Sequence, residues 1–185
     1  MIRQLTVVLL VLLAGCSLEY DMVDESADDG RPEIELRNLS HTVVRSNRIQ
    51  LRVFSAYSRT YQSQNRQVLN DVYFWEYGTD GEIASEGRSD SAEVFLETED
   101  IVFEGNIQLY SHVEEAGVNA DFLEWSGEER QLQGRDGELV EIERDDGSVI
   151  RGSGFLADMR RRSIVFTQNI EGTFIDRDTE NETTE

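Results

Sequence analysis

Apolar and polar side chains alternate in short runs along this chain. Ile49, Leu51 and Val53 are separated by single polar residues, and the run from Val43 to Tyr57 predicts one long strand. After residue 15, no window of 11 or more residues repeats its apolar side chains at helical spacing. Turn signals, such as Gly-Thr-Asp-Gly at 78–81, separate the runs. The pattern predicts an all-β antiparallel protein built from short strands.

A seven-residue motif occurs twice. Residues 101–107 read IVFEGNI and residues 164–170 read IVFTQNI, so five of the seven positions are identical and the copies begin 63 residues apart. We therefore expect one β unit to be used more than once. The second copy continues into a predicted half-buried strand from Ile164 to Phe174 with one apolar side.

The facing of residues 149–157, just before the second copy, stays open. Gly154 shares its parity with Ile150, whereas Val149 and Phe155 have the opposite parity. Either set could face a core. Glycine inside a strand indicates a bulge or a close approach of another backbone.

The N-terminus carries the features of a bacterial lipoprotein precursor. A basic Arg3 precedes a nine-residue apolar run at 5–13, which is short for a membrane-spanning helix. Leu13-Ala14-Gly15-Cys16 follows, and Cys16 is the only cysteine of the chain. We expect residues 1–15 to be a signal peptide and Cys16 to receive the lipid. More than one acyl chain on this cysteine would give a stable anchor.

The rest of the chain divides by composition. Residues 16–31 are acidic and unpatterned, which predicts a tether that ends at Pro32. Residues 32–175 hold the alternating runs and predict one β domain. Residues 176–185 are acidic and rich in threonine, which predicts a disordered tail.

Composition argues against several kinds of function. The chain has 17 basic residues, all arginine, against 38 acidic ones, for a net charge of −21. Such an acidic protein is a poor partner for nucleic acid. Without lysine there is neither a P-loop nor a Schiff base. His41 and His112 lack partners at zinc-ligand spacing, so we expect no metal site and no cofactor.

Several motifs in order resemble the LptC family, the membrane-anchored periplasmic component of lipopolysaccharide export. The resemblance covers about residues 32 to 175. It lies in the N-terminal anchor and in the segments 72–77 (VYFWEY), 103–107 (FEGNI), 123–125 (LEW), 146–158 (DGSVIRGSGFLAD) and 169–172 (NIEG). Members of this family mostly carry a transmembrane helix, so this chain resembles a lipoprotein variant.

The resemblance implies a twisted, open antiparallel β-jellyroll with acyl chains between two facing sheets. Such a protein accepts lipopolysaccharide, or a related glycolipid, from an inner-membrane ABC transporter. It passes the lipid to an LptA-like bridge toward the outer membrane and has no catalytic residues. We expect a periplasmic protein anchored at the inner membrane, with the outer membrane as the alternative.

The candidate lipid-binding residues are apolar side chains expected to point inward. Each could instead belong to an ordinary core, because burial stabilises by about 1.5–3 kcal/mol per large side chain in both cases. They are Leu51, Val53, Val72, Phe74, Leu96, Ile101, Phe103, Ile107, Leu109, Leu123, Trp125, Val149, Phe155, Ile164, Phe166, Ile170 and Phe174.

The second copy of the motif is also the candidate partner edge. Open jellyrolls leave edge strands unpaired, and unpaired edges accept an added strand. The resemblance places bridge docking at the C-terminal edge, on Ile164, Phe166, Ile170 and Phe174. The basic run Arg160–Arg162 is interpreted as a solvated turn, with anionic head groups as the alternative.

Two other hypotheses remain open at this point. One is an all-β lipoprotein that binds carbohydrate or protein and has a closed sandwich core. The other is a hydrolase with an acidic pair, because acids are abundant and no pair stands out.

Overall fold

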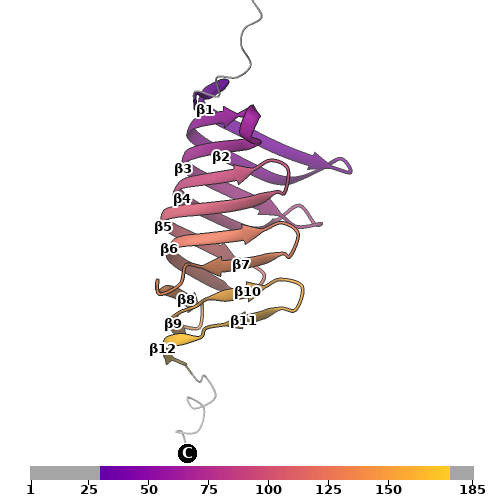
Figure 1. The fold of residues 1–185 in the computed structure, drawn as a ribbon. Coiled ribbons are helices and arrows are strands. Elements are labelled where there is room, and N and C mark those ends of the chain that lie inside the picture. The colour runs from indigo at the N-terminus through magenta and orange to yellow at the C-terminus, as the bar shows by residue number, and fades with distance from the viewer. Residues whose placement is uncertain (1–29, 176–185) are drawn as a thin grey trace, which may run out of the picture. The chain divides into compact units, whose positions relative to one another are not determined.

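The computed structural model describes residues 30–175 and contains a single 12-stranded antiparallel sheet (Figure 1). The predicted signal peptide, Cys16, most of the tether and the predicted tail lie outside these residues. The strands are β1 (Ile34–Arg45), β2 (Arg48–Tyr61), β3 (Arg66–Tyr77), β4 (Ile83–Phe95), β5 (Asp100–Ser111), β6 (Ala116–Ser126), β7 (Gln131–Gly134), β8 (Val140–Arg144), β9 (Val149–Ser153), β10 (Leu156–Asp158), β11 (Ser163–Val165) and β12 (Gln168–Thr173). A single turn of 3-10 helix, η1 (Gln62–Gln64), joins β2 to β3.

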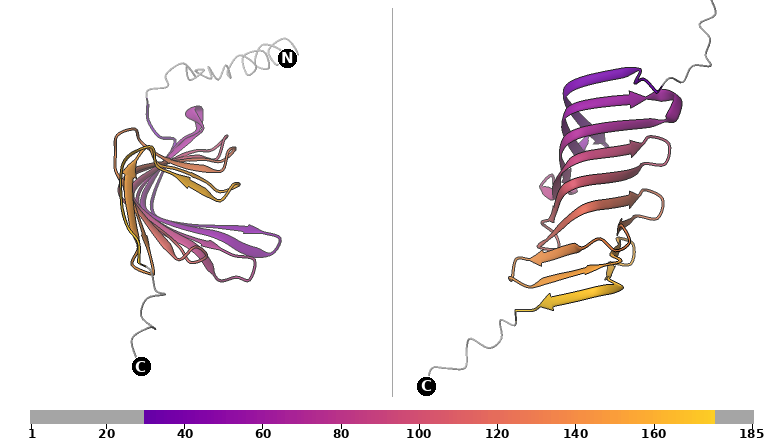
Figure 2. Two further views of the ribbon diagram at one scale, coloured as in Figure 1. Left: turned by 90° about the horizontal axis from the view of Figure 1, so that it is seen from below. Right: turned by 60° about the vertical axis from the view of Figure 1, so that its left-hand side comes forward.

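The strands bend, so the sheet forms two walls joined along one corner (Figure 2). Each of the strands β1 to β6 contributes one half to each wall. Beyond β6 the halves are separate strands: β7, β10 and β11 continue one wall, and β8, β9 and β12 continue the other. We call the first wall A and the second wall B.

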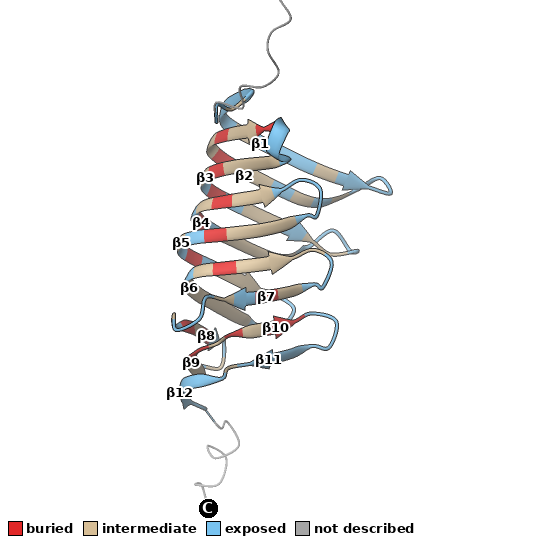
Figure 3. Cartoon of the chain, in the orientation of Figure 1, coloured by how far each residue is buried: buried red, intermediate tan, exposed pale blue. Residues whose placement is uncertain are grey.

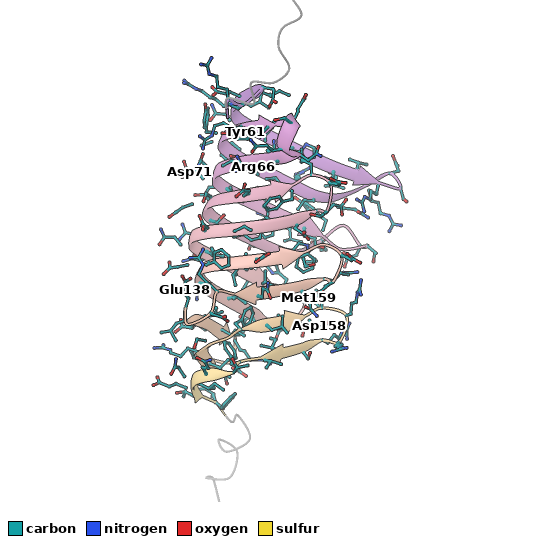
Figure 4. The ribbon with its side chains drawn as sticks, in the orientation of Figure 1. Tyr61, Arg66, Asp71, Glu138, Asp158 and Met159 are labelled. Atoms are coloured by element: carbon teal, nitrogen blue, oxygen red, sulfur yellow. The ribbon has the colours of Figure 1, made fainter. Side chains whose placement is uncertain are left out.

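Asparagine, aspartate and glycine make the corner. Asn38, Asp71, Asn106 and Asn169 adopt φ of 52°, 52°, 46° and 52° inside or between paired segments. Asn and Asp tolerate this left-handed region better than other residues with a Cβ. Asp71 has no paired residue in either neighbouring strand, and its side chain lies at the corner in Figure 4. Asn38, Asp71 and Asn106 lie where β1, β3 and β5 turn from one wall into the other, and Asn169 lies where the chain joins wall B.

The repeated motif encodes this corner. In the first copy, the register between β5 and β6 shifts between Glu104 and Ile107, and Asn106 has positive φ. In the second copy, the register between β12 and β9 shifts between Gln168 and Glu171, and Asn169 has positive φ. Both copies therefore begin on wall A and end on wall B, which confirms that one β unit is reused.

The prediction of one half-buried strand from Ile164 to Phe174 is wrong. The chain leaves wall A after Val165 and joins wall B at Gln168, so β11 pairs with β10 and β12 pairs with β9. Ile164, Ile170 and Phe174 are 56%, 55% and 76% exposed. They are exposed because no described strand follows β11 or β12.

The predicted long strand from Val43 to Tyr57 is also two elements. β1 ends at Arg45 and β2 begins at Arg48, with Ser46 and Asn47 at positive φ in the tight turn between them. The four residues from Arg45 to Arg48 are all polar, a turn signal that the prediction of one strand overlooked.

A second corner resolves the facing of residues 149–157. β9 ends at Ser153, Gly154 adopts φ of 65°, and β10 begins at Leu156 on the other wall. Ile150 packs against the core from wall B, and Phe155 is buried after the corner. Before Gly154 the even-numbered residues, such as Ile150, face the core, and after it the odd-numbered residues, such as Phe155, do so. Each of the two facings predicted from the sequence therefore holds on one side of Gly154.

The core lies between the walls close to the corner. Leu123 and Ile107 are 0% and 1% exposed, and buried residues form a band across successive strands in Figure 3. β1 pairs only with β2, and β11 and β12 end the opposite side of the sheet. The sheet therefore stays open, which confirms the predicted open antiparallel jellyroll and leaves no closed sandwich.

Replacing Gly154 with alanine is expected to destabilise the protein by about 2–4 kcal/mol. The added Cβ would keep a strained positive φ and collide with the Thr167 side chain. Gly81→Ala is the matched control, because Gly81 has φ of 90° and open space around the added Cβ. Urea unfolding of both variants separates the collision from the backbone strain, and equal losses would contradict the proposed close packing at the corner.

Candidate functional site: the inner face between the walls

Wall B carries a row of inward side chains with one residue from nearly every strand. Strand register aligns the members side by side, and side chains opposite each other on neighbouring strands share a face. The row runs His41, Val53, Phe74, Gly87, Leu109, Val118, Ile142, Ile150 and Gly172. It therefore extends from β1 to β12.

Wall A carries a corresponding row from β1 to β11. Its members are Ile34, Thr60, Gln67, Val94, Ile101, Trp125, Leu132, Ala157 and Ile164. Apolar residues make up the row from Val94 onward. Together the two rows give a lengthwise apolar lining from the middle of the sheet to its C-terminal edge.

The two walls touch in the middle of the sheet. The rings of Phe74 on wall B and Phe103 on wall A lie 6.1 Å apart at an interplanar angle of 31°. Phe155 and Phe166 make a similar contact at 5.3 Å near the C-terminal end. The interior is thus packed near the corner, and Phe74, Ile101, Leu109 and Trp125 pack against it only partly buried.

Most of the predicted lipid-binding residues come together on this inner face. Val72, Phe103, Ile107, Leu123 and Phe155 are buried in the core. The partly buried packing partners include Val53, Phe74, Ile101, Leu109, Trp125 and Phe166. Leu51 stands opposite Val43, two residues along β2 from Val53. Ile164, Ile170 and Phe174 are exposed at the C-terminal edge.

Two candidates do not lie in the inner rows. Leu96 follows the last residue of β4 in a turn and is 48% exposed. Val149 stands opposite Glu143 on β8, one residue out of phase with the inward Ile150. Leu96 is excluded because the strand ends before it, and Val149 is excluded by its strand register. Neither feature can be read from the sequence.

Sequence reasoning missed several inward residues. Leu69 is buried, although it follows a polar stretch that gave no strand signal. Gly87 lies in the inner row, and a Cβ there would meet the Phe74 and Leu109 side chains at 2.6 and 2.7 Å. Val118 and Ile142 also lie in the inner row of wall B, opposite each other on β6 and β8. Gly87 stands between Glu86 and Arg88 in the sequence, so nothing in the chain marks it as an inward position.

The basic run lies in the turn between β10 and β11. Asp158 accepts hydrogen bonds from the backbone N–H groups of Arg160 and Arg161, both at 2.9 Å. The Arg161 N–H, the Gln131 side chain and the Arg160 N–H hold the pKa of Asp158 below its usual range. Asp158 thereby stabilises the turn, where Figure 4 labels Asp158 and Met159. The three arginines of the run are exposed.

Residues 30–175 form strands, turns and one short 3-10 helix. No helix in this part of the chain has the length and hydropathy needed to cross a membrane. No group of three or more His, Cys, Asp or Glu residues in it is arranged to hold a metal ion.

Comparison with solved structures supports the fold. LptH of Pseudomonas aeruginosa, described as the LptA homologous periplasmic component of the lipopolysaccharide transport device, superposes with a TM-score of 0.56. The match covers 68% of this chain and 95% of LptH at 10% sequence identity, so it speaks for the fold alone. A comparison with curated proteins gives no match.

Comparison with family models covers nearly the whole chain. The model described as "Lipopolysaccharide-assembly, LptC-related" matches residues 5–176. This range includes every strand described above. The chain therefore belongs to the LptC-related family of lipopolysaccharide assembly.

Proposed function

We propose that this protein carries lipopolysaccharide, or a related glycolipid, through the periplasm between its two walls. It would accept the lipid from an inner-membrane ABC transporter and pass it to an LptA-like bridge. The observation that carries the proposal is the pair of inner rows, which extend through the sheet and leave apolar side chains exposed at its C-terminal edge. The family match agrees with it.

Acyl chains would enter by separating the walls. The walls are covalently continuous only at the corner, and side-chain contacts such as Phe74 with Phe103 hold them together elsewhere. Replacing these contacts by contacts with acyl chains keeps apolar surface away from water, so the exchange has a small net cost. Movement of lipid therefore needs no catalytic group in this chain, and the transporter's ATPase would supply the energy.

The two ends of the sheet would serve as docking edges. β1 at one end and β11 with β12 at the other each have one unpaired side within the described residues. Unpaired backbone groups accept an added strand from a partner. Addition of a jellyroll at the C-terminal edge would cover Ile164, Ile170 and Phe174 and continue the inner rows into the next protein.

The anchor would be the lipid on Cys16. An acidic segment at 16–31 would connect it to the first strand and hold the β domain near the inner membrane. The absence of Asp after the cysteine leaves delivery to the outer membrane as the alternative.

Ile101→Glu is expected to lower the lipopolysaccharide retained by the purified protein at least about tenfold, since a carboxylate on the inner face would have to lose its hydration beside acyl chains. Val102→Glu is the matched control. Val102 is also half-buried, on the same strand, but has the opposite facing. Lipid extraction with mass spectrometry measures retention, and circular dichroism verifies folding. Equal retention by two folded variants would contradict transport along the inner face.

A further inference from the structure

The outer face of wall B carries an aromatic and polar hollow that lipid transport along the inner face does not use. The register aligns Trp75, Glu86, Tyr110 and Gly117 on neighbouring strands β3 to β6. These residues are one position out of phase with the inward Phe74, Gly87, Leu109 and Val118, so they face away from the core. Because Gly117 has no side chain, the row has a gap between Tyr110 and Glu143 on β8.

A second outward row borders the first. It consists of Tyr73, Arg88, Gln108 and Asn119, again one residue from each of β3 to β6. The Arg88 Nε donates a hydrogen bond to the Gln108 Oε1 at 3.0 Å, which holds the two side chains together. Two aromatic rings therefore stand at one end of the hollow and planar polar groups at the other.

The hollow has the size and rigidity of a binding site. Its volume is about 520 Å³, and a second depression of about 470 Å³ shares Gln108 and Asn119 with it. Tyr110 is held by hydrogen bonds from its hydroxyl to Asp145 at 2.9 and 3.1 Å and by edge contact with the His112 ring at 4.8 Å. The hydrogen bond to Asp145 also raises the pKa of Tyr110. Sites for small ligands are usually such preformed hollows of several hundred Å³.

The lining excludes most classes of ligand. Three acidic residues, Glu86, Glu143 and Asp145, outnumber the two arginines of the lining, so the hollow does not favour an anion. Leu109 is the only aliphatic residue of the lining, and its side chain lies on the inner face, so the hollow gives an acyl chain no aliphatic surface to contact. Strands β3 to β6 are paired on both sides at this level, so no edge is open to an added peptide strand.

We propose that this hollow binds an uncharged oligosaccharide segment. A pyranose ring has an apolar face of C–H groups that stacks on Trp or Tyr, and a rim of hydroxyls that bonds amides, carboxylates and guanidinium groups. Trp75 and Tyr73 supply the stacking surface. Arg88, Gln108 and Asn119 supply the polar rim, and the adjoining depression extends the site for further sugar units.

Two envelope sources share this chemistry: the saccharide of a glycolipid and the glycan strands of the cell wall. Trp75 serves as the reporter in the full chain carrying Trp125→Phe, which removes the only other tryptophan. We would titrate this protein with a neutral oligosaccharide released from lipopolysaccharide and, separately, with neutral N-acetylglucosamine oligomers, which stand for the glycan strand of the cell wall. Saturable change of Trp75 emission with either ligand supports the site, and the responding ligand identifies the source.

Two variants decide whether the response comes from the hollow. A Cβ at Gly117 would meet its nearest atoms at 3.6–3.9 Å, so Gly117→Leu fits the backbone and fills the gap. It should weaken binding at least about tenfold, which is a loss of about 1.4 kcal/mol. Tyr77→Ala removes an aromatic outside the lining and should leave binding unchanged. No response to either glycan at millimolar concentration, or a response that Gly117→Leu does not weaken, would overturn the proposal.

This test is separate from the test of lipid transport. Gly117→Leu lies on the outer face and should retain as much lipopolysaccharide as the unchanged protein. Failure of the glycan titration would leave the inner-face proposal standing, and failure of Ile101→Glu to lower lipid retention would leave the outer site standing.

Discussion

Covalent joining of the two walls is expected to lower lipopolysaccharide uptake at least about tenfold, because acyl chains enter only when the walls separate. Phe74→Cys with Phe103→Cys places two thiols at the position of a cross-wall ring contact of 6.1 Å. Cys16 is the only native cysteine, so Cys16→Ala gives a background without other thiols. A short bifunctional thiol reagent would then join the walls before lipid is added.

The order of treatment distinguishes gating from simple damage. Protein that is loaded with lipid first and joined afterwards should keep its lipid longer than unjoined protein. Val53→Cys with Phe74→Cys is the matched control, because these residues are neighbours on the same wall. Its joining should leave uptake unchanged. Equal uptake by cross-wall and same-wall joined proteins would show that the walls need not separate.

Removing residues 164–185 is expected to abolish binding of an LptA-like bridge protein while membrane association persists. The deletion takes away β11, β12 and the exposed apolar side chains at the end of the inner rows. The incoming jellyroll then loses both its strand-pairing edge and its apolar contact. Co-purification from membranes with the bridge protein measures this loss. Deletion of 176–185 alone is the control and should retain binding.

Cys16→Ala is the reciprocal variant of the same experiment. Without the proposed lipid, the protein should move from the membrane to the soluble fraction, since acyl chains would supply about 0.8 kcal/mol per buried CH₂ group. It should still bind the bridge protein. Bridge binding by the 164–185 deletion, or an unchanged membrane fraction for Cys16→Ala, would contradict the assigned edge or anchor.

Alternation predicted the fold class because a strand shows its two faces directly in the sequence. It could not predict the corner. Asn106 and Asn169 occupy the same place in the two motif copies, yet a single asparagine is equally common in a surface turn. The left-handed conformation of these asparagines becomes evident only once the strands on both sides of them are known to be paired. The sequence therefore did not reveal that the strand breaks between Val165 and Gln168.

The inner face was predicted best where strands are longest. Phe103, Ile107 and Leu109 lie on one long strand, and their shared facing follows from spacing with one shift at the corner. Val149 has the right chemistry but the wrong phase, because β9 is short and Gly154 resets the alternation. Contacts between walls, such as Phe74 with Phe103, join positions far apart in the chain and leave no pattern in a single sequence.

Photocrosslinking in living cells tests the central claim most directly. A photoreactive residue placed at Ile101 should form a lipopolysaccharide adduct, whereas the same residue at Val102, on the opposite face of β5, should form none. Gel mobility and detection of the glycolipid in the adduct give the readout. Adducts of equal yield at both positions, or at neither, would contradict passage of lipid between the walls.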